Sequence, residues 1–163
     1  MLDMEAFGEF RQGLTLLRDG DADTAAEVLR RAFERDPHDP FYMSYYGLSL
    51  GHAQGRWDLA ERLCHTAVCR NRRQAQLYLN LAEVYLASGR RRAAADTLAR
   101  ALHRLPHDIR LHEEFGRLML RRPPVLHFLP RANLLNRRLG FMRHHLLLYV
   151  PHRKWLAPAE SRA

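Results

Sequence analysis

The sequence predicts an all-α fold in which helix hairpins stack into a solenoid. A unit of about 34 residues recurs along the chain, and a fixed period of this length is typical of repeat architectures. Small residues, which allow two helices to approach closely, occupy one position of successive units: Gly13, Gly47, Ala82 and Gly116. Prolines, aspartates and glycines separate the segments between these positions. Together these observations predict two helices and a tight turn in each unit.

The residues between the segments match the chemistry of helix ends. Residues 36–39 read Asp-Pro-His-Asp and residues 105–108 read Leu-Pro-His-Asp. In such a sequence the proline ends one helix and the final aspartate caps the next. Gly20, Gly55 and Gly89 lie inside the units, where glycine tolerates the backbone angles that end a helix. Each unit is therefore predicted to be a helix hairpin.

The third unit has the most informative residue pattern. Its residues resemble the tetratricopeptide repeat at these positions: Tyr78, Ala82, Tyr85, Gly89, Ala94, Leu98, Ala101 and Pro106. The resemblance implies antiparallel helix pairs stacked into a right-handed α-solenoid. The second unit departs from the pattern, because it has one extra residue between Gly47 and Ala60 and carries Arg72 where proline is usual. Members of this family mostly bind other proteins, so the resemblance implies a binding platform.

The repeat pattern ends at residue 122. Residues 121–124 read Arg-Arg-Pro-Pro where the fourth unit should turn, and two prolines cannot continue a helix. We expect a C-terminal extension after this point and a capping helix before it, which shields the last repeat. The expected boundaries are a solenoid over 1–122, with repeats 6–39, 40–74 and 75–108 and a capping helix 109–122, followed by the extension 123–163.

Charge is distributed unevenly along the chain. The net charge is +8, yet residues 1–120 contain 17 basic and 17 acidic residues. Residues 121–163 contain nine basic residues against the single acid Glu160. The sequence thus predicts a neutral repeat array with a basic tail, in which the candidate contacts are Arg131, Arg137, Arg138 and Arg143.

The tail also carries apolar residues in two segments. Val125 and Phe128 belong to a proline-bounded strip that either packs on the array or docks on a partner. Residues 133–150 place apolar residues at spacings of three and four, which predicts an amphipathic helix with a basic side. Such a helix can pack on its own solenoid, enter a partner's groove or lie on an anionic membrane. Its apolar docking residues are Leu135, Leu139, Met142 and Leu146.

The resemblance implies that ligands bind on a concave surface lined by the first helix of each pair. Relatives that grip a terminal carboxylate use lysine, asparagine and arginine there, but the matching positions hold Phe10, Leu14 and Gln76, and only Asn80 agrees. A carboxylate clamp is therefore not expected. Either the residues projected to this surface form an apolar trough, or some of them fill contacts between repeats. The candidate trough residues are Phe10, Leu14, Leu17, Phe41, Ser44, Leu48, Leu79, Glu83 and Leu86.

Motifs for catalysis or cofactor binding are not evident. Cys64 and Cys69 are five residues apart, so they point about 140° apart on a helix, and neither a disulfide nor a shared metal is expected. The histidines are scattered, and the chain has no glycine-rich phosphate loop or recognisable nucleophile motif. We expect no enzyme activity, cofactor, metal or small-molecule substrate. The acidic N-terminus does not resemble a secretion signal, which favours the cytoplasm, with membrane association through the tail as an option.

Two functions are consistent with these features. The first is an adaptor that binds a peptide or helix of another protein through the apolar trough, while the tail docks or tethers the complex. The alternative is a binder of RNA, the ribosome or an anionic membrane, with the basic tail as the contact. Self-association through the apolar tail stays open.

Overall fold

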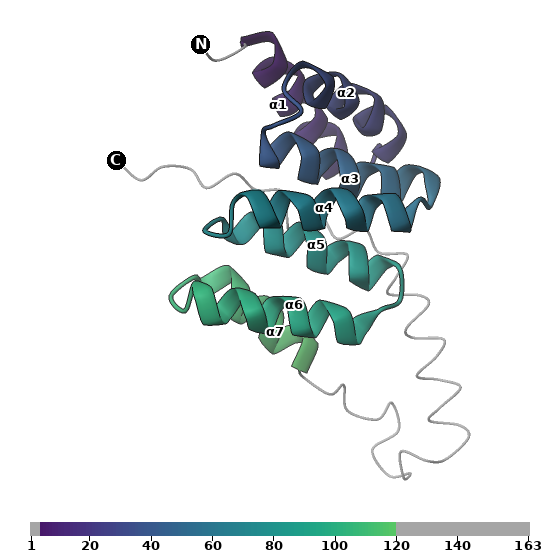
Figure 1. Ribbon diagram of the computed structural model, residues 1–163. Coiled ribbons are helices and arrows are strands. Elements are labelled where there is room, and N and C mark those ends of the chain that lie inside the picture. Colours follow the sequence, from purple (N-terminus) through teal and green to yellow (C-terminus); the bar gives the residue numbers. More distant parts are fainter. Residues whose placement is uncertain (1–3, 120–163) are drawn as a thin grey trace, which may run out of the picture.

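The computed structural model describes residues 4–119, and within them the chain is helical throughout, with short turns (Figure 1). The predicted all-α fold is therefore confirmed. The candidate tail residues, the apolar strip and the helix expected at 133–150 lie outside the described residues. The helices are α1 (Met4–Asp19), α2 (Ala22–Arg35), α3 (Pro40–Gln54), α4 (Trp57–Arg70), α5 (Ala75–Ala87), α6 (Arg91–Arg104) and α7 (Ile109–Met119).

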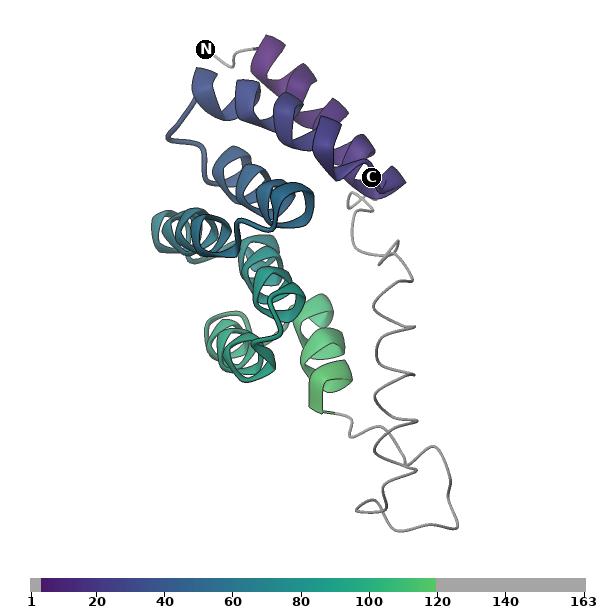
Figure 2. The same cartoon turned by 90° about the vertical axis from the view of Figure 1, so that its right-hand side faces the viewer.

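The helices pair in chain order and then stack. α1 packs against α2, α3 against α4 and α5 against α6, while α7 packs on α6 and α5. The odd-numbered helices also contact one another in sequence, from α1 to α3, α5 and α7. In Figure 2, α3, α5 and α7 lie on one side of the array and α4 and α6 on the other. We call the layer of α1, α3, α5 and α7 the odd-helix layer.

Aspartates begin three of the helices through side-chain hydrogen bonds. Asp39 Oδ1 accepts from the backbone N–H groups of Phe41 at 2.7 Å and Tyr42 at 3.0 Å, and Pro40 occupies the first turn of α3. Asp108 Oδ1 accepts from the amides of residues 110 and 111 at 3.1 and 3.3 Å. Asp21 accepts from Thr24 N–H at the start of α2. Hydrogen bonds from the side chain and the backbone of Thr24 lower the pKa of Asp21. The two capping aspartates expected from the Pro-His-Asp motifs are confirmed.

The glycine turns within the hairpins have two geometries. Gly20, Gly55 and Gly89 all adopt positive φ, at 89°, 65° and 79°. Around Gly20 and Gly89 the next amide bonds to a carbonyl five residues earlier, as in a Schellman motif. Gly55 N–H instead bonds to Gly51 O at 3.0 Å, the simpler left-handed cap. The extra residue of the second unit therefore lengthens α3 and changes how this helix ends.

Small residues allow close helix contact in the first two hairpins. A Cβ atom on Gly13 would lie 2.4 Å from Leu29 Cγ, and one on Gly47 would lie 2.9 Å from Leu63 Cβ. Ala82 is buried at the same position of the third unit. At Gly116, however, a Cβ atom would meet no described atom within 4 Å. The fourth small residue therefore has the expected register but not the expected close contact.

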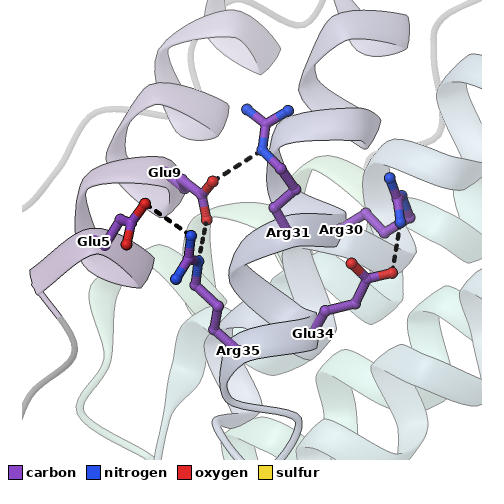
Figure 3. A network of polar contacts seen from close by, with 6 residues as sticks. All are labelled: Glu5, Glu9, Arg30, Arg31, Glu34 and Arg35. Atoms are coloured by element: carbon purple, nitrogen blue, oxygen red, sulfur yellow. Dashed lines mark hydrogen bonds and ion pairs between the residues drawn. The ribbon is translucent and has the colours of Figure 1, made fainter.

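Charged residues connect the helices at the surface. In the first hairpin Glu9 binds Arg31 at 2.8 Å and Arg35 at 3.1 Å, and Glu5 also pairs with Arg35 (Figure 3). Such exposed pairs contribute about 0–1 kcal/mol each. Their value here is in orientation, because they connect α1 to α2 on the side that carries no apolar stripe.

A second polar contact joins the second and third hairpins. Glu61 of α4 accepts hydrogen bonds from Tyr85 at 2.8 Å and from Arg90 at 2.6 Å. Burial alone would raise the pKa of Glu61, but these two bonds outweigh it and the pKa lies below its ordinary value. The guanidinium of Arg90 also lies over the Tyr85 ring, 4.8 Å from its centroid. This contact fixes the turn after α5 against the preceding repeat.

Candidate functional site

The candidate site is the outward side of the odd-helix layer, where the helices are unusually apolar. α3 contains no Asp, Glu, Lys or Arg, and α5 contains only Glu83. The even-numbered helices differ, because the exposed positions of α2, α4 and α6 are mostly charged. A helix that is apolar on all sides is normally buried on all sides. Within the odd-helix layer, α3 and α5 therefore have the composition of covered helices, whereas α1 and α7 carry charged residues.

The nine predicted trough residues fall into two groups. Ser44, Leu48 and Leu79 are buried and fill the interior between repeats. The other six are half-buried, with the apolar ones packed against the core from the odd-helix layer: Phe10, Leu14, Leu17, Phe41, Glu83 and Leu86. Ser44, Leu48 and Leu79 thus fill contacts between repeats, and a trough lined by the other six stays a prediction.

Phe115 of α7 extends the half-buried apolar set to the last helix of the layer. We define the odd-helix face by the half-buried apolar side chains Phe10, Leu14, Leu17, Phe41, Leu86 and Phe115.

An aromatic cluster anchors the N-terminal end of the odd-helix face. The Phe10 ring lies 4.8 Å from that of Tyr42 and 5.5 Å from that of Tyr45, centroid to centroid. These are favourable tilted and edge-on arrangements, which hold α1 in position against α3. Burial raises the pKa of Tyr45 to about 12, although a hydrogen bond with Asn80 and the charge of Arg110 act in the opposite direction. Tyr45 therefore stays neutral and serves as a packing and hydrogen-bonding group.

A chain of hydrogen bonds crosses the layer beneath this face. Asn80 Nδ2 donates to Ser44 Oγ at 3.0 Å, and Asn80 Oδ1 accepts from Gln76 Nε2 at 2.9 Å. Gln76 Oε1 in turn accepts from Arg110 of α7 at 3.3 Å. Asn80 is 3% exposed, so both ends of its amide are occupied inside the protein. The one residue that agrees with a carboxylate clamp is thus used to join repeats.

Cys64 lies at the inner end of the same chain. Its thiol is fully buried, lies 3.3 Å from Ser44 O, and has a pKa raised to about 12 by burial. Cys69 is exposed on α4. Cys64 therefore serves as a small buried residue, since a thiol with so high a pKa is unreactive.

Carboxylates gather where α5 meets α7. Glu114 is 8% exposed, and Arg117 Nη1 lies 2.5 Å from its Oε1, yet no described group donates an aligned hydrogen bond to that oxygen. Burial raises the pKa of Glu114 to about 7, with Glu83 and Glu113 adding to the rise and Arg117 opposing it. Glu83 lies 3.7 Å from His52 Nε2 of α3. The C-terminal end of the odd-helix layer is therefore acidic.

Sequence reasoning missed Tyr45 and Glu114, although the repeat register contains a signal for both. Tyr45, Asn80 and Glu114 occupy the same position of successive units, the sixth after the unit begins. Asn80 and Glu114 are two of the few polar residues that are buried among those described, and Tyr45 is buried as well. A polar residue at an inward position of one repeat should therefore prompt inspection of the same position in the others.

The described part of the chain offers little for chemistry. It holds no group of three or more His, Cys, Asp or Glu side chains that could bind a metal ion. None of its helices is both long and apolar enough to cross a bilayer.

Comparison with known proteins gives consistent results for the fold. Two family models, both described as tetratricopeptide repeat, match residues 10–68 and 52–113. No curated protein matches the chain significantly. The first TPR domain of human RPAP3 is similar over 70% of this chain and 89% of that domain, with 19% identity and a TM-score of 0.59.

Two further solved structures are similar to this chain. The first TPR of Spaghetti (RPAP3), bound to the HSP90 peptide SRMEEVD, is 19% identical over 71% of this chain and 93% of its own, with a TM-score of 0.58. The *Yersinia enterocolitica* chaperone SycD, in complex with a peptide of the translocator YopD, is 18% identical over 68% of this chain and 84% of its own, with a TM-score of 0.56. At these identities the similarity establishes the fold alone.

Proposed function

Because the chain belongs to the tetratricopeptide repeat family, we propose that it is a non-catalytic adaptor whose odd-helix face binds an apolar segment of a partner protein. The observation that carries this proposal is the composition of α3 and α5, which together contain a single Asp, Glu, Lys or Arg residue, Glu83. Apolar side chains at half-buried positions offer contact area to a partner without the cost of removing charges from water.

Solved structures of similar fold support peptide binding as the kind of function. RPAP3 and SycD are both solved with peptides of other proteins, so arrays of this fold serve as peptide receptors. This chain should select a different peptide from RPAP3. Phe10 and Leu14 occupy positions where carboxylate-binding relatives place polar residues, and the Asn80 amide is bonded to Ser44 and Gln76. The expected ligand is an apolar helix or strip.

The test compares two kinds of peptide on the full-length protein. Apolar amphipathic peptides, selected by display on the immobilised protein, should bind saturably, whereas the acidic peptide SRMEEVD should show no saturable binding up to about 1 mM. Phe10→Ala and Leu14→Ala should each lower the affinity for the selected peptides about tenfold or more, because truncating a central apolar contact costs over 1 kcal/mol. Fluorescence anisotropy measures all of these constants.

The matched control is Leu102→Ala, which removes a half-buried leucine from α6 in the other layer. It should leave peptide affinity unchanged. Tight binding of SRMEEVD, or equal losses for Leu102→Ala and Leu14→Ala, would contradict the proposed site.

The basic composition of residues 121–163 favours one alternative, binding to RNA or an anionic membrane through the tail. Poly(U) and phosphatidylserine vesicles are suitable probes for this activity. Binding through the tail should fall steeply with salt and should require Arg137, Arg138 and Arg143, because it depends on counterion release. Binding of an apolar peptide to the odd-helix face should instead resist salt.

A further inference from the structure

The odd-helix layer is packed on one side only. α3 contacts α1, α2, α4 and α5, and α5 contacts α3, α4, α6 and α7. In Figure 2, α3, α5 and α7 follow one another on the side of the array that faces away from α4 and α6. Both helices are nevertheless apolar on all sides, and helices of this kind are covered on all sides in soluble proteins. The exposed residues of the two helices are His52, Gln54 and Ala87, so the apolar area left for an occupant is that of the half-buried side chains of the odd-helix face.

The charges around the face indicate which charges an occupant should have. Two carboxylates, Glu113 and Glu114, share one guanidinium, since Arg117 lies 3.9 Å from the first and 2.5 Å from the second. Glu83 lies 3.7 Å from His52 Nε2, and this imidazole carries a charge only when it is protonated. The Glu114 carboxyl at this end thus interacts with two further carboxylates, Glu83 and Glu113, and with one guanidinium, Arg117, while Arg110 pairs with Asp108. An occupant that fits this end is apolar with basic residues beside the apolar ones.

The chain itself contains a segment of this chemistry. Residues 133–150 have an apolar row at helical spacing and three arginines at 137, 138 and 143. The described part of the chain ends at Met119, at the end of α7, which flanks the acidic end of the layer. The 13 residues between 119 and 133 can extend over roughly 40 Å, so they can reach any part of the face. A helix of 18 residues is about 27 Å long.

We propose that residues 133–150 dock on the odd-helix face of their own chain, with the apolar row against Phe10, Leu86 and Phe115 and an arginine against Glu83 and Glu114. The proposal uses the same face as the proposed function. A partner segment must therefore displace the chain's own segment, and the tail acts as an internal competitor. A guanidinium beside Glu114 would also supply the hydrogen bond that Glu114 Oε1 lacks among the described residues.

Paramagnetic broadening on the full-length protein tests this placement without any partner. Cys69→Ser removes the exposed thiol, and the buried Cys64 does not react, so a nitroxide on His144→Cys labels the polar side of the segment alone. Amide signals of α1, α3, α5 and α7 near the odd-helix face should broaden, and those on the outer side of α2, α4 and α6 should not. Broadening of the outer side, or none at all, would overturn the proposal.

A mixed sample identifies the occupant. One chain is isotope-labelled without nitroxide, and the other carries the nitroxide without isotope. Docking within one chain predicts no broadening in this mixture, whereas broadening would show that a second copy occupies the face and would overturn docking in cis. A failure of either kind leaves the proposed function to its own test, because peptide binding to the face is measured separately whether the face is open or held by a second copy.

Charge variants test the polar anchor. Glu83→Gln with Glu114→Gln should weaken docking about tenfold, and Glu27→Gln on α2 should not change it. The Glu114 carboxyl provides a second readout by NMR titration. With Arg137, Arg138 and Arg143 replaced by glutamine, the pKa of Glu114 should be higher than in the native chain, because a docked arginine favours the charged carboxylate. Identical titration curves would contradict a docked arginine.

Discussion

Gly47 and Gly116 occupy the same register position but have different surroundings, so they allow a clean comparison of close packing and helix propensity. Gly47 lies against Leu63, and a Cβ atom there would also lie 3.1 Å from the Ala60 carbonyl oxygen. At Gly116 no described atom lies within 4 Å of such a Cβ. One glycine is required by a neighbouring helix, and the other is not.

Gly47→Ala should lower the free energy of unfolding. Overpacking typically costs about 1–3 kcal/mol, which exceeds the gain of about 0.5–1 kcal/mol from replacing a helical glycine with alanine. Gly116→Ala should keep that gain and raise the free energy of unfolding. Urea unfolding followed by circular dichroism measures both variants. A stabilised Gly47→Ala would mean that α3 and α4 can separate at little cost.

Helix α3 shows how one element combines a strong start, an altered end and an apolar body. Asp39 and Pro40 define its first turn, and Gly55 ends it in a left-handed conformation. α4, α5 and α6 begin without a side-chain capping bond. At the N-terminus of α3, a single side chain thus satisfies two backbone N–H groups of the odd-helix layer.

Asp39→Ala should destabilise the protein by about 1 kcal/mol, because two amide N–H groups at the start of α3 lose their acceptor. Asp39→Asn keeps an acceptor oxygen and should cost much less. Thermal unfolding of the two variants provides the measurement. Equal losses for Ala and Asn would show that the charge of Asp39, rather than its hydrogen bonds, stabilises the start of α3.

At the scale of the whole molecule, contacts between helices reach only near neighbours along the stack. α1 contacts α2 and α3, and α7 contacts α5 and α6. The stability of such an array is approximately a sum of repeat and interface contributions, so damage at one end should stay near that end.

Leu111→Ala and Leu29→Ala test this locality at opposite ends of the array. Both leucines are fully buried, and each truncation should cost about 2–5 kcal/mol. In Leu111→Ala, hydrogen exchange should accelerate in α6 and α7 while α1 and α2 stay protected, and Leu29→Ala should show the reverse. Uniform acceleration over all seven described helices in both variants would instead indicate one cooperative unit.

The sequence by itself determined the elements and their order, because each rests on local chemistry. The repeat period, the capping aspartates and the glycines with positive φ all act within a few residues of their own position. The sequence also contained the extra residue before Gly55, and only the geometry of the turn had to come from the structure. The same register identified the residues of the odd-helix layer.

Only the tertiary structure decided which residues of that layer face outward. Ser44, Leu48 and Leu79 are buried and Phe10, Leu14 and Leu86 are half-buried, although all six are compatible with an apolar stripe. Periodicity gives the direction of a side chain around its own helix, but burial depends on which other helices pack there. For the same reason Gly116 lacks the close contact that Gly47 makes. The pattern of α7 alone also does not predict that the carboxylate of Glu114 is buried.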